Sequence, residues 1–97
     1  MSEKLEATVP AGNALETRRK RLIFRSWHRG MREMDLLMGS FAEKHLASLT
    51  PDQLDHYERL LDLLDPDVYD WILGRTPYPE TVDAGLMAKL QAHRFAS

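Results

Sequence analysis

Apolar residues in this 97-residue chain recur at the spacing of an amphipathic helix, and almost none alternate as they would in a strand. The clearest run starts at Met34 and continues at helical spacing through Leu37, Met38, Phe41, Ala42, His45 and Leu46. Residues three and four positions apart share one face of a helix, so this run predicts a helix with one buried side. β-branched residues are also few, which argues further against a sheet.

Capping residues mark where the next helix begins. Thr50 can cap it, Pro51 suits its first position, and Gln53 completes a capping box. The apolar stripe of this predicted helix runs from Leu54 to Leu64.

A second set of helix-boundary residues follows. We expect Asp65 to cap a helix that begins at Pro66 and ends at Gly74. Two further helices are predicted, one over residues 15–28 and one over about residues 80–93.

Together these segments predict an all-α fold, a small five-helix bundle with short connections. We expect one helical domain over residues 15–95, preceded by a flexible tail of residues 1–14. Its expected core consists of large apolar side chains, namely Leu37, Phe41, Leu61, Leu64, Trp71, Ile72, Leu86 and Leu90.

Several classes of chemistry lack the residues they need. The chain has no cysteine, which excludes disulfides, thiolate catalysis and iron–sulfur clusters. Among its histidines and acids, only Asp52 and His56 have metal-ligand spacing on a helix, and Asp52 stands in a first turn where an acid is favoured anyway. No phosphate-binding glycine loop or nucleophile elbow is present. We therefore expect neither an enzyme nor a protein with a metal or cofactor of its own.

Neither the apolar runs nor the first fifteen residues resemble a membrane span or a signal peptide, so we expect no membrane insertion.

Charge is unevenly distributed along the chain. Residues 18–32 carry seven basic residues and no acid, whereas residues 33–83 carry twelve acids against three basic residues, a net charge of −9. The basic segment leaves open a nucleic-acid-binding or general protein-interaction function. The acidic remainder would repel phosphates, so a basic helix that docks on a protein is favoured.

The segment Arg29-Gly30-Met31-Arg32-Glu33 interrupts the predicted helices with a glycine between charged residues. It can be a simple helix break, in which Gly30 supplies backbone freedom and Glu33 favours the start of the next helix. It can also be a charged contact surface.

This segment, followed by Met34-Asp35-Leu36-Leu37 and by the later block from Asp65-Pro66-Asp67 to Ile72, closely resembles the succinate dehydrogenase flavinylation assembly factors. The resemblance runs from about Arg19 to Leu90. It implies a small five-helix bundle, in agreement with the periodicity.

The resemblance also implies a function. Family members help attach FAD covalently to a histidine of the flavoprotein subunit of succinate dehydrogenase, and some act on the fumarate reductase subunit. We accordingly expect a cytoplasmic assembly factor that acts on the FAD of its partner. Arg29, Gly30 and Glu33 match the family's signature. Around them we expect the partner-binding surface to include Arg25, His28, Met31 and Arg32.

Overall fold

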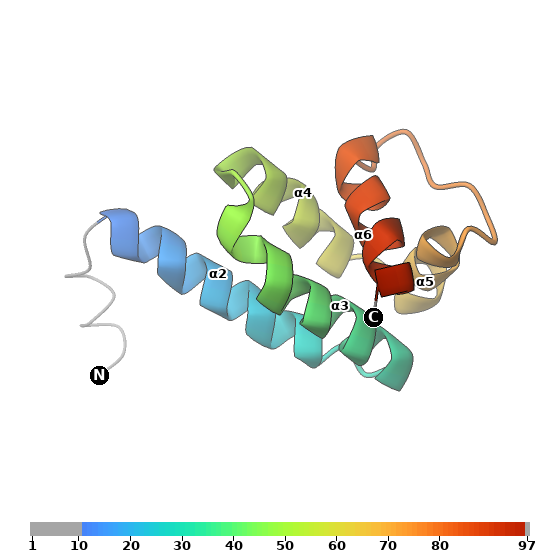
Figure 1. Cartoon of the computed structure of the whole chain (residues 1–97), viewed down its shortest axis with the longest axis horizontal. Coiled ribbons are helices and arrows are strands. Elements are labelled where there is room, and N and C mark those ends of the chain that lie inside the picture. Colours follow the sequence, from blue (N-terminus) through green and yellow to red (C-terminus); the bar gives the residue numbers. More distant parts are fainter. Residues whose placement is uncertain (1–10, 97) are drawn as a thin grey trace.

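The computed structural model describes residues 11–96, and within that range it contains five α-helices, one short 3-10 helix and no strand. The all-α five-helix prediction is confirmed. The elements are α2 (Ala11–Trp27), α3 (Arg32–His45), the 3-10 helix η1 (Leu46–Ser48), α4 (Pro51–Leu61), α5 (Asp65–Leu73) and α6 (Ala84–Ala96). Figure 1 shows α2 and α3 lying antiparallel along one side, with α4 and α6 packed above them and α5 at one end.

The first helix begins at Ala11 rather than at Leu15, so residues 11–14 of the expected tail are helical. Residues 1–10 of that tail lie outside the described part of the chain.

Two of the predicted helix boundaries are confirmed by their backbone and side-chain contacts. Gln53 N donates to Thr50 Oγ1 at 3.2 Å, and Thr50 N donates to Gln53 Oε1 at 2.9 Å, which completes the capping box. Gly74 ends α5 with a left-handed φ of +76°, a conformation that glycine adopts without a steric penalty.

Two other boundaries were predicted wrongly. Asp65 does not cap α5, because Leu64 occupies the cap position and no side chain bonds there. The last helix begins at Ala84, not near Glu80, because the Asp83 carboxylate accepts the Leu86 N–H at 2.8 Å and so caps the helix there.

The core lies between the five α-helices and contains most of the side chains expected there. Phe41, Leu61, Ile72, Leu86 and Leu90 are buried, whereas Leu37 and Trp71 are half-buried at its edge. The prediction for Leu64 was wrong. It is 72% exposed, because α4 ends at Leu61 and the chain turns away before the helical stripe reaches it.

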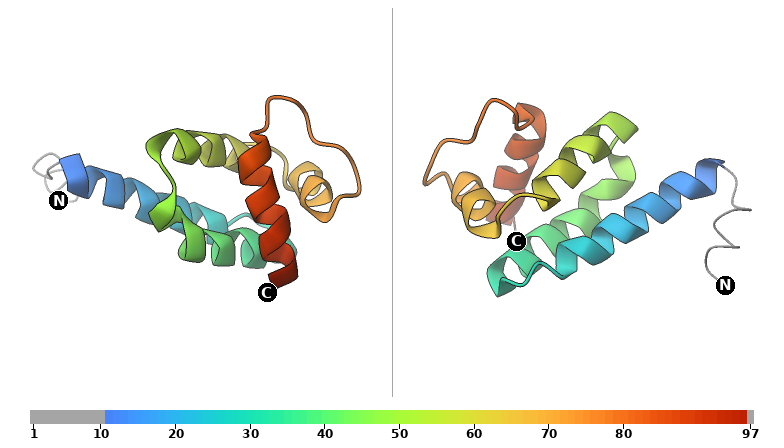
Figure 2. Two further views of the ribbon diagram at one scale, coloured as in Figure 1. Left: turned by 45° about the horizontal axis from the view of Figure 1, so that its top comes forward. Right: turned by 180° about the vertical axis from the view of Figure 1, so that it is seen from behind.

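The α2–α3 pair is held close by a glycine. Gly39 is buried on α3 directly under the Trp27 ring, and a Cβ atom at that position would overlap the ring. The indole Nε1 donates to the Glu43 carboxylate at 2.8 Å. Both views in Figure 2 show α3 beside the C-terminal part of α2, whose N-terminal end extends beyond it. The missing side chain therefore sets the distance between them.

A buried hydroxyl pair joins three helices through the core. Tyr57 of α4 is fully buried, and its hydroxyl lies 2.6 Å from Ser26 Oγ of α2 and 3.2 Å from the Met38 carbonyl of α3. Ser26 Oγ in turn lies 2.7 Å from the Leu22 carbonyl. Both buried hydroxyls are thus hydrogen-bonded, as such groups must be to avoid a desolvation penalty.

Candidate functional site

The turn between α2 and α3 is built around Gly30, which has a φ of +98° and is exposed. No heavy atom lies within 4 Å of the position that a Cβ atom would occupy. Only glycine adopts this backbone readily, so the residue type is set by conformation, and the surface above it is open.

The turn is fixed from within by Asp35, in the first turn of α3. Its carboxylate accepts a hydrogen bond from the backbone N–H of Arg29 at 2.5 Å. The backbone N–H of Asp35 donates to the Met31 carbonyl at 2.9 Å. An acid at a helix start is favoured by the helix dipole and here also closes the turn.

Arg29 ties the turn to the start of α5. Its Nη2 and Nε atoms lie 2.6 Å and 2.9 Å from Asp65 Oδ1, and Nη2 also donates to the Leu63 carbonyl at 3.2 Å. The two side chains are only 10% and 12% exposed. Arg29 therefore holds the site in shape, with its charge already neutralised inside the chain.

The neighbouring residues of the turn face solvent. His28, Gly30, Arg32 and Glu33 are exposed, while Met31 is half-buried against the core. The Glu33 carboxylate makes no ion pair or hydrogen bond within residues 11–96. The expected exposure of Gly30 and Glu33 at the break between two helices is confirmed.

Apolar side chains surround this turn. One hollow of about 450 Å³ lies between the Gly30 turn and the α4–α5 connection, where it is lined by Leu63, Leu64 and Pro66. Another of about 470 Å³ lies beside Glu33 and is lined by Leu36, Tyr69 and Leu73, among others.

The large hydrophobic side chains that are exposed in the described chain all lie at this end. They are Phe24, Leu36, Leu63 and Leu64, which are 63%, 54%, 41% and 72% exposed. Phe24 stacks on the His28 ring at 4.0 Å, and the other three line the two hollows beside the turn. Exposed apolar side chains grouped around charged ones are typical of a protein-binding surface. We call this surface, from His28 to Leu36 with Leu63 and Leu64, the turn face.

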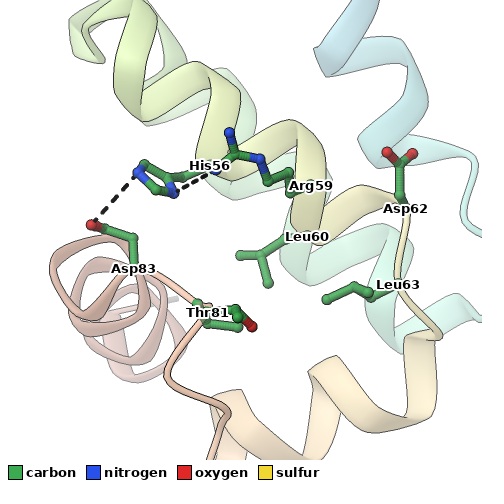
Figure 3. A pocket seen from close by; sticks show the side chains of 8 residues that line it. His56, Arg59, Leu60, Asp62, Leu63, Thr81 and Asp83 are labelled. Atoms are coloured by element: carbon green, nitrogen blue, oxygen red, sulfur yellow. Dashed lines mark hydrogen bonds and ion pairs between the residues drawn. The ribbon is translucent and has the colours of Figure 1, made fainter.

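A third hollow of about 320 Å³ adjoins the turn face at Leu63 and is shown in Figure 3. Leu60 and Leu63 lie along its inner side, and Asp83 and His56 stand together at its rim. At its rim, His56 Nε2 lies 4.0 Å from Asp83 and His56 Nδ1 lies 3.3 Å from Arg59 Nη1, while Asp62 accepts from Arg25 at 2.8 Å.

Several arginines of the basic segment bind acids or carbonyls elsewhere in the chain, as Arg29 does. Arg18 pairs with Asp55 and Glu58 of α4 at 2.6 Å and 2.9 Å. Arg19 donates to the Leu46 and Leu49 carbonyls at 2.8 Å and 2.7 Å, where α3 and η1 end. Arg25 pairs with Asp62 and is only partly exposed. The opposite charges seen along the sequence thus neutralise one another across the α2–α4 contact.

The part of the chain that the structure describes contains no group of three or more histidines and acids able to hold a metal ion. No helix within residues 11–96 is long and apolar enough to cross a membrane.

Comparison with known proteins connects this surface to a family. Residues 20–94 match the family model described as the flavinator of succinate dehydrogenase. The match includes α3, α4, α5 and the whole Gly30 turn. The chain belongs to this family.

Individual flavinator-family relatives are similar over most of this chain. The chain is 42% identical over 79 residues to succinate dehydrogenase assembly factor 2, mitochondrial, of Dictyostelium discoideum. The aligned region covers 81% of this chain and 56% of that relative. The chain is also 40% identical over 79 residues to the FAD assembly factor SdhE of Acetobacter pasteurianus. That aligned region covers 81% of this chain and 72% of the relative. The chain thus spans little more than half the length of the first relative and most of the second.

Sequence reasoning singled out Arg29, Gly30 and Glu33 but missed residues that support the turn. Asp65 was interpreted as a helix cap, although it binds Arg29 from 36 positions away. Leu64 was assigned to the core, although it forms part of the turn face. The available signal was Pro66, which marks the start of α5 and leaves residues 62–64 to the connection between the two helices.

Proposed function

We propose that this protein is an assembly factor that binds the flavoprotein subunit of succinate dehydrogenase and promotes covalent attachment of FAD to it. The observation that carries the proposal is the turn face. It presents an unpaired carboxylate at Glu33 beside an open glycine turn, between two apolar hollows. Membership of the flavinator family supports the choice of partner.

The proposed role is that of a binding protein, not an enzyme. FAD and the acceptor histidine would both belong to the partner, and this chain would contribute no cofactor of its own. Its surface would hold the subunit in a conformation in which the flavin and the histidine meet in reactive geometry. The carboxylate of Glu33 can accept hydrogen bonds from the partner, and the bare backbone at Gly30 allows the partner to approach closely.

The sequence predicted that Arg29 belongs to the partner-binding surface, but we propose a supporting role for it. Because its guanidinium is committed to Asp65, it would position the turn for binding and would not itself contact the partner. Arg32 and His28 are exposed and remain available for direct contacts.

Other parts of the proposal follow from the same family. The flavoprotein subunit of fumarate reductase is a second proposed client. We place the protein in the cytoplasm with its client, although several relatives are named as mitochondrial.

The nucleic-acid alternative has less support in the structure. It would use the arginines of α2, but Arg18 and Arg25 already pair with acids of α4 and the residue that follows it. The turn face, in contrast, is apolar around its charges, which suits a protein partner.

The deciding experiment is reconstitution of flavinylation. The apo flavoprotein subunit is incubated with FAD, with and without this protein, and covalent flavin is read by in-gel fluorescence after denaturation. We expect the protein to accelerate attachment and Glu33→Ala to abolish most of that acceleration.

Glu80→Ala is the matched control, since Glu80 is an exposed acid outside the turn face. It should leave the acceleration unchanged. Acceleration by Glu33→Ala equal to that of the unaltered protein would show that the turn face is not the active surface. No acceleration by the unaltered protein would refute the function itself.

A further inference from the structure

A small basic hollow, separate from those beside the turn face, lies between α3 and α6. Its volume is about 210 Å³, and it is lined by Lys44, His45, Lys89, Ala92 and His93. Lys44 and His45 end α3, whereas Glu33 stands in its first turn. At 1.5 Å per residue the two places are roughly 18 Å apart along the helix.

His93 is the most unusual group in this lining. It is 7% exposed, and its Nε2 lies 2.8 Å from Ser40 Oγ. Its other ring nitrogen, Nδ1, is buried and has no hydrogen-bond partner. A buried polar atom without a partner is uncommon in folded proteins and calls for a physical reason.

The contacts of Ser40 define the protonation of this ring. Ser40 Oγ lies 2.6 Å from the Leu36 carbonyl, and a hydroxyl has one hydrogen to donate. The hydroxyl therefore donates to Leu36 and accepts from Nε2–H of His93. The neutral ring then carries a bare lone pair at Nδ1, and a proton added there finds no acceptor among the described side chains.

Among the described side chains, the fixed charges that lower the pKa of the two imidazoles belong to Lys44 and Lys89. The ring of His45 lies 5.6 Å from that of His93 in an edge-on arrangement. Burial lowers the pKa of both histidines, and Lys44 lowers both further. Among the described side chains, no carboxylate lines the hollow. Such a site repels metal cations and attracts anions.

We propose that this hollow binds a small dianionic oxyanion of the phosphate class. Two lysine ammonium groups provide two fixed positive charges, and the imidazoles add more when an anion favours their protonation. A phosphate, with two charges and several acceptor oxygens, matches this set better than a single carboxylate does. The anion also supplies the negative charge that a proton on His93 lacks within the protein.

Compensation of the helix dipole explains only part of the cluster. Lys44 and His45 lie in the last turn of α3, where positive charge is favoured in any protein. Lys89 lies in the middle of α6, and the unpartnered Nδ1 belongs to His93. Neither of these is accounted for by the end of α3.

The test is a titration of the full chain with inorganic phosphate, at about pH 7.5, where phosphate is mostly dianionic, and with ionic strength held constant by sodium chloride. Histidine side-chain NMR signals report binding. We expect saturable shifts of the His45 and His93 signals, a raised pKa for His93, and weaker binding of succinate than of phosphate. Lys89→Ala should weaken phosphate binding about tenfold, the value of one charge-assisted contact.

Lys20→Ala is the matched control, because Lys20 is an exposed lysine on α2 outside the hollow. It should bind phosphate like the unaltered protein. Shifts that are linear in phosphate and equal in chloride, or equal losses in the two lysine variants, would overturn the proposal. Tighter binding of succinate would overturn the phosphate assignment. None of these results depends on flavinylation, so the proposed function is tested separately.

Discussion

Arg29 and Asp65 form an ion pair, with N–O distances of 2.6 Å and 2.9 Å, in which both side chains are about nine-tenths buried. The pair joins the turn after α2 to the first turn of α5, two segments 36 residues apart in sequence. The geometry of the Gly30 turn therefore depends on the packing of a distant helix, and a mutation in α5 can act on the turn face.

Removing one partner of this pair should destabilise the protein. Asp65→Asn leaves the Arg29 guanidinium buried without its counter-charge, so we expect a loss of about 3 kcal/mol in the free energy of unfolding. Urea denaturation of the two proteins measures it. Asp70→Asn is the control, because its pair with Arg75 is exposed and longer, at 3.4 Å. It should cost less than about 1 kcal/mol. Equal losses would mean that the buried pair has no special weight.

Substitutions of Gly30 should separate stability from binding. Any side chain at a φ of +98° is strained, so Gly30→Ala and Gly30→Arg should each cost about 1 kcal/mol. Neither side chain meets another atom at its Cβ, so the two losses should be similar.

Binding of the flavoprotein subunit should nevertheless fall much further for Gly30→Arg than for Gly30→Ala, because the long side chain obstructs the turn face. Thermal melts and a pull-down of the purified subunit measure both effects. Gly74→Ala, at a φ of +76° with open space around it, gives the cost of strain alone. Equal binding by the two Gly30 variants would refute close approach at this turn.

Gly39→Ala should destabilise the protein although alanine is the better helix former. Helix propensity would favour alanine by about 1 kcal/mol. A Cβ at Gly39 overlaps the Trp27 ring, however, and overpacking of this kind costs about 1–3 kcal/mol. We expect a net loss of up to about 2 kcal/mol in chemical denaturation.

The same substitution provides its own test in a second background. In Trp27→Ala, where the ring is absent, Gly39→Ala should become neutral or stabilising. If it costs as much with the ring removed, the overlap with Trp27 does not limit the approach of the two helices.

Stability should fall on mild acidification because of His45 and His93. Burial lowers the pKa of both histidines in the folded state, so the unfolded chain binds protons first as the pH falls. Their contribution is complete above the ordinary histidine pKa of about 6.5 and is lost progressively below it. Urea melts between about pH 7.5 and pH 5, in phosphate-free buffer, should show this loss. His93→Gln should reduce the slope over this range, and an unchanged slope would assign the loss to other groups.

Features that depend on a few neighbouring residues were predictable from the sequence. The capping box at Thr50, the left-handed end of α5 at Gly74 and the helical stripe after Met34 are all confirmed. Each is decided by contacts within about four positions of the chain, which the order of residues specifies directly. The exposed break at Gly30 belongs to the same class.

Features that depend on distant partners required the tertiary structure. Asp65 has the local signature of a cap, but the ion pair with Arg29 determines where its carboxylate lies. In the sequence, Leu64 continues the helical stripe of α4. The helix ends three residues earlier, however, and Leu64 is exposed. The sequence predicted that the basic helix docks on a protein. In the fold, acids of α4 and of the residue that follows it already pair with arginines of that helix.

The sequence alone therefore determined the helices, most of the core and the exposed break at Gly30. The tertiary structure decided which of these charges are exposed for a partner and which are already paired. Local hydrogen bonds and helical periodicity are short-range and can be followed along the chain. An ion pair between residues 29 and 65, or an unpartnered imidazole at residue 93, exists only after packing has brought separate helices together.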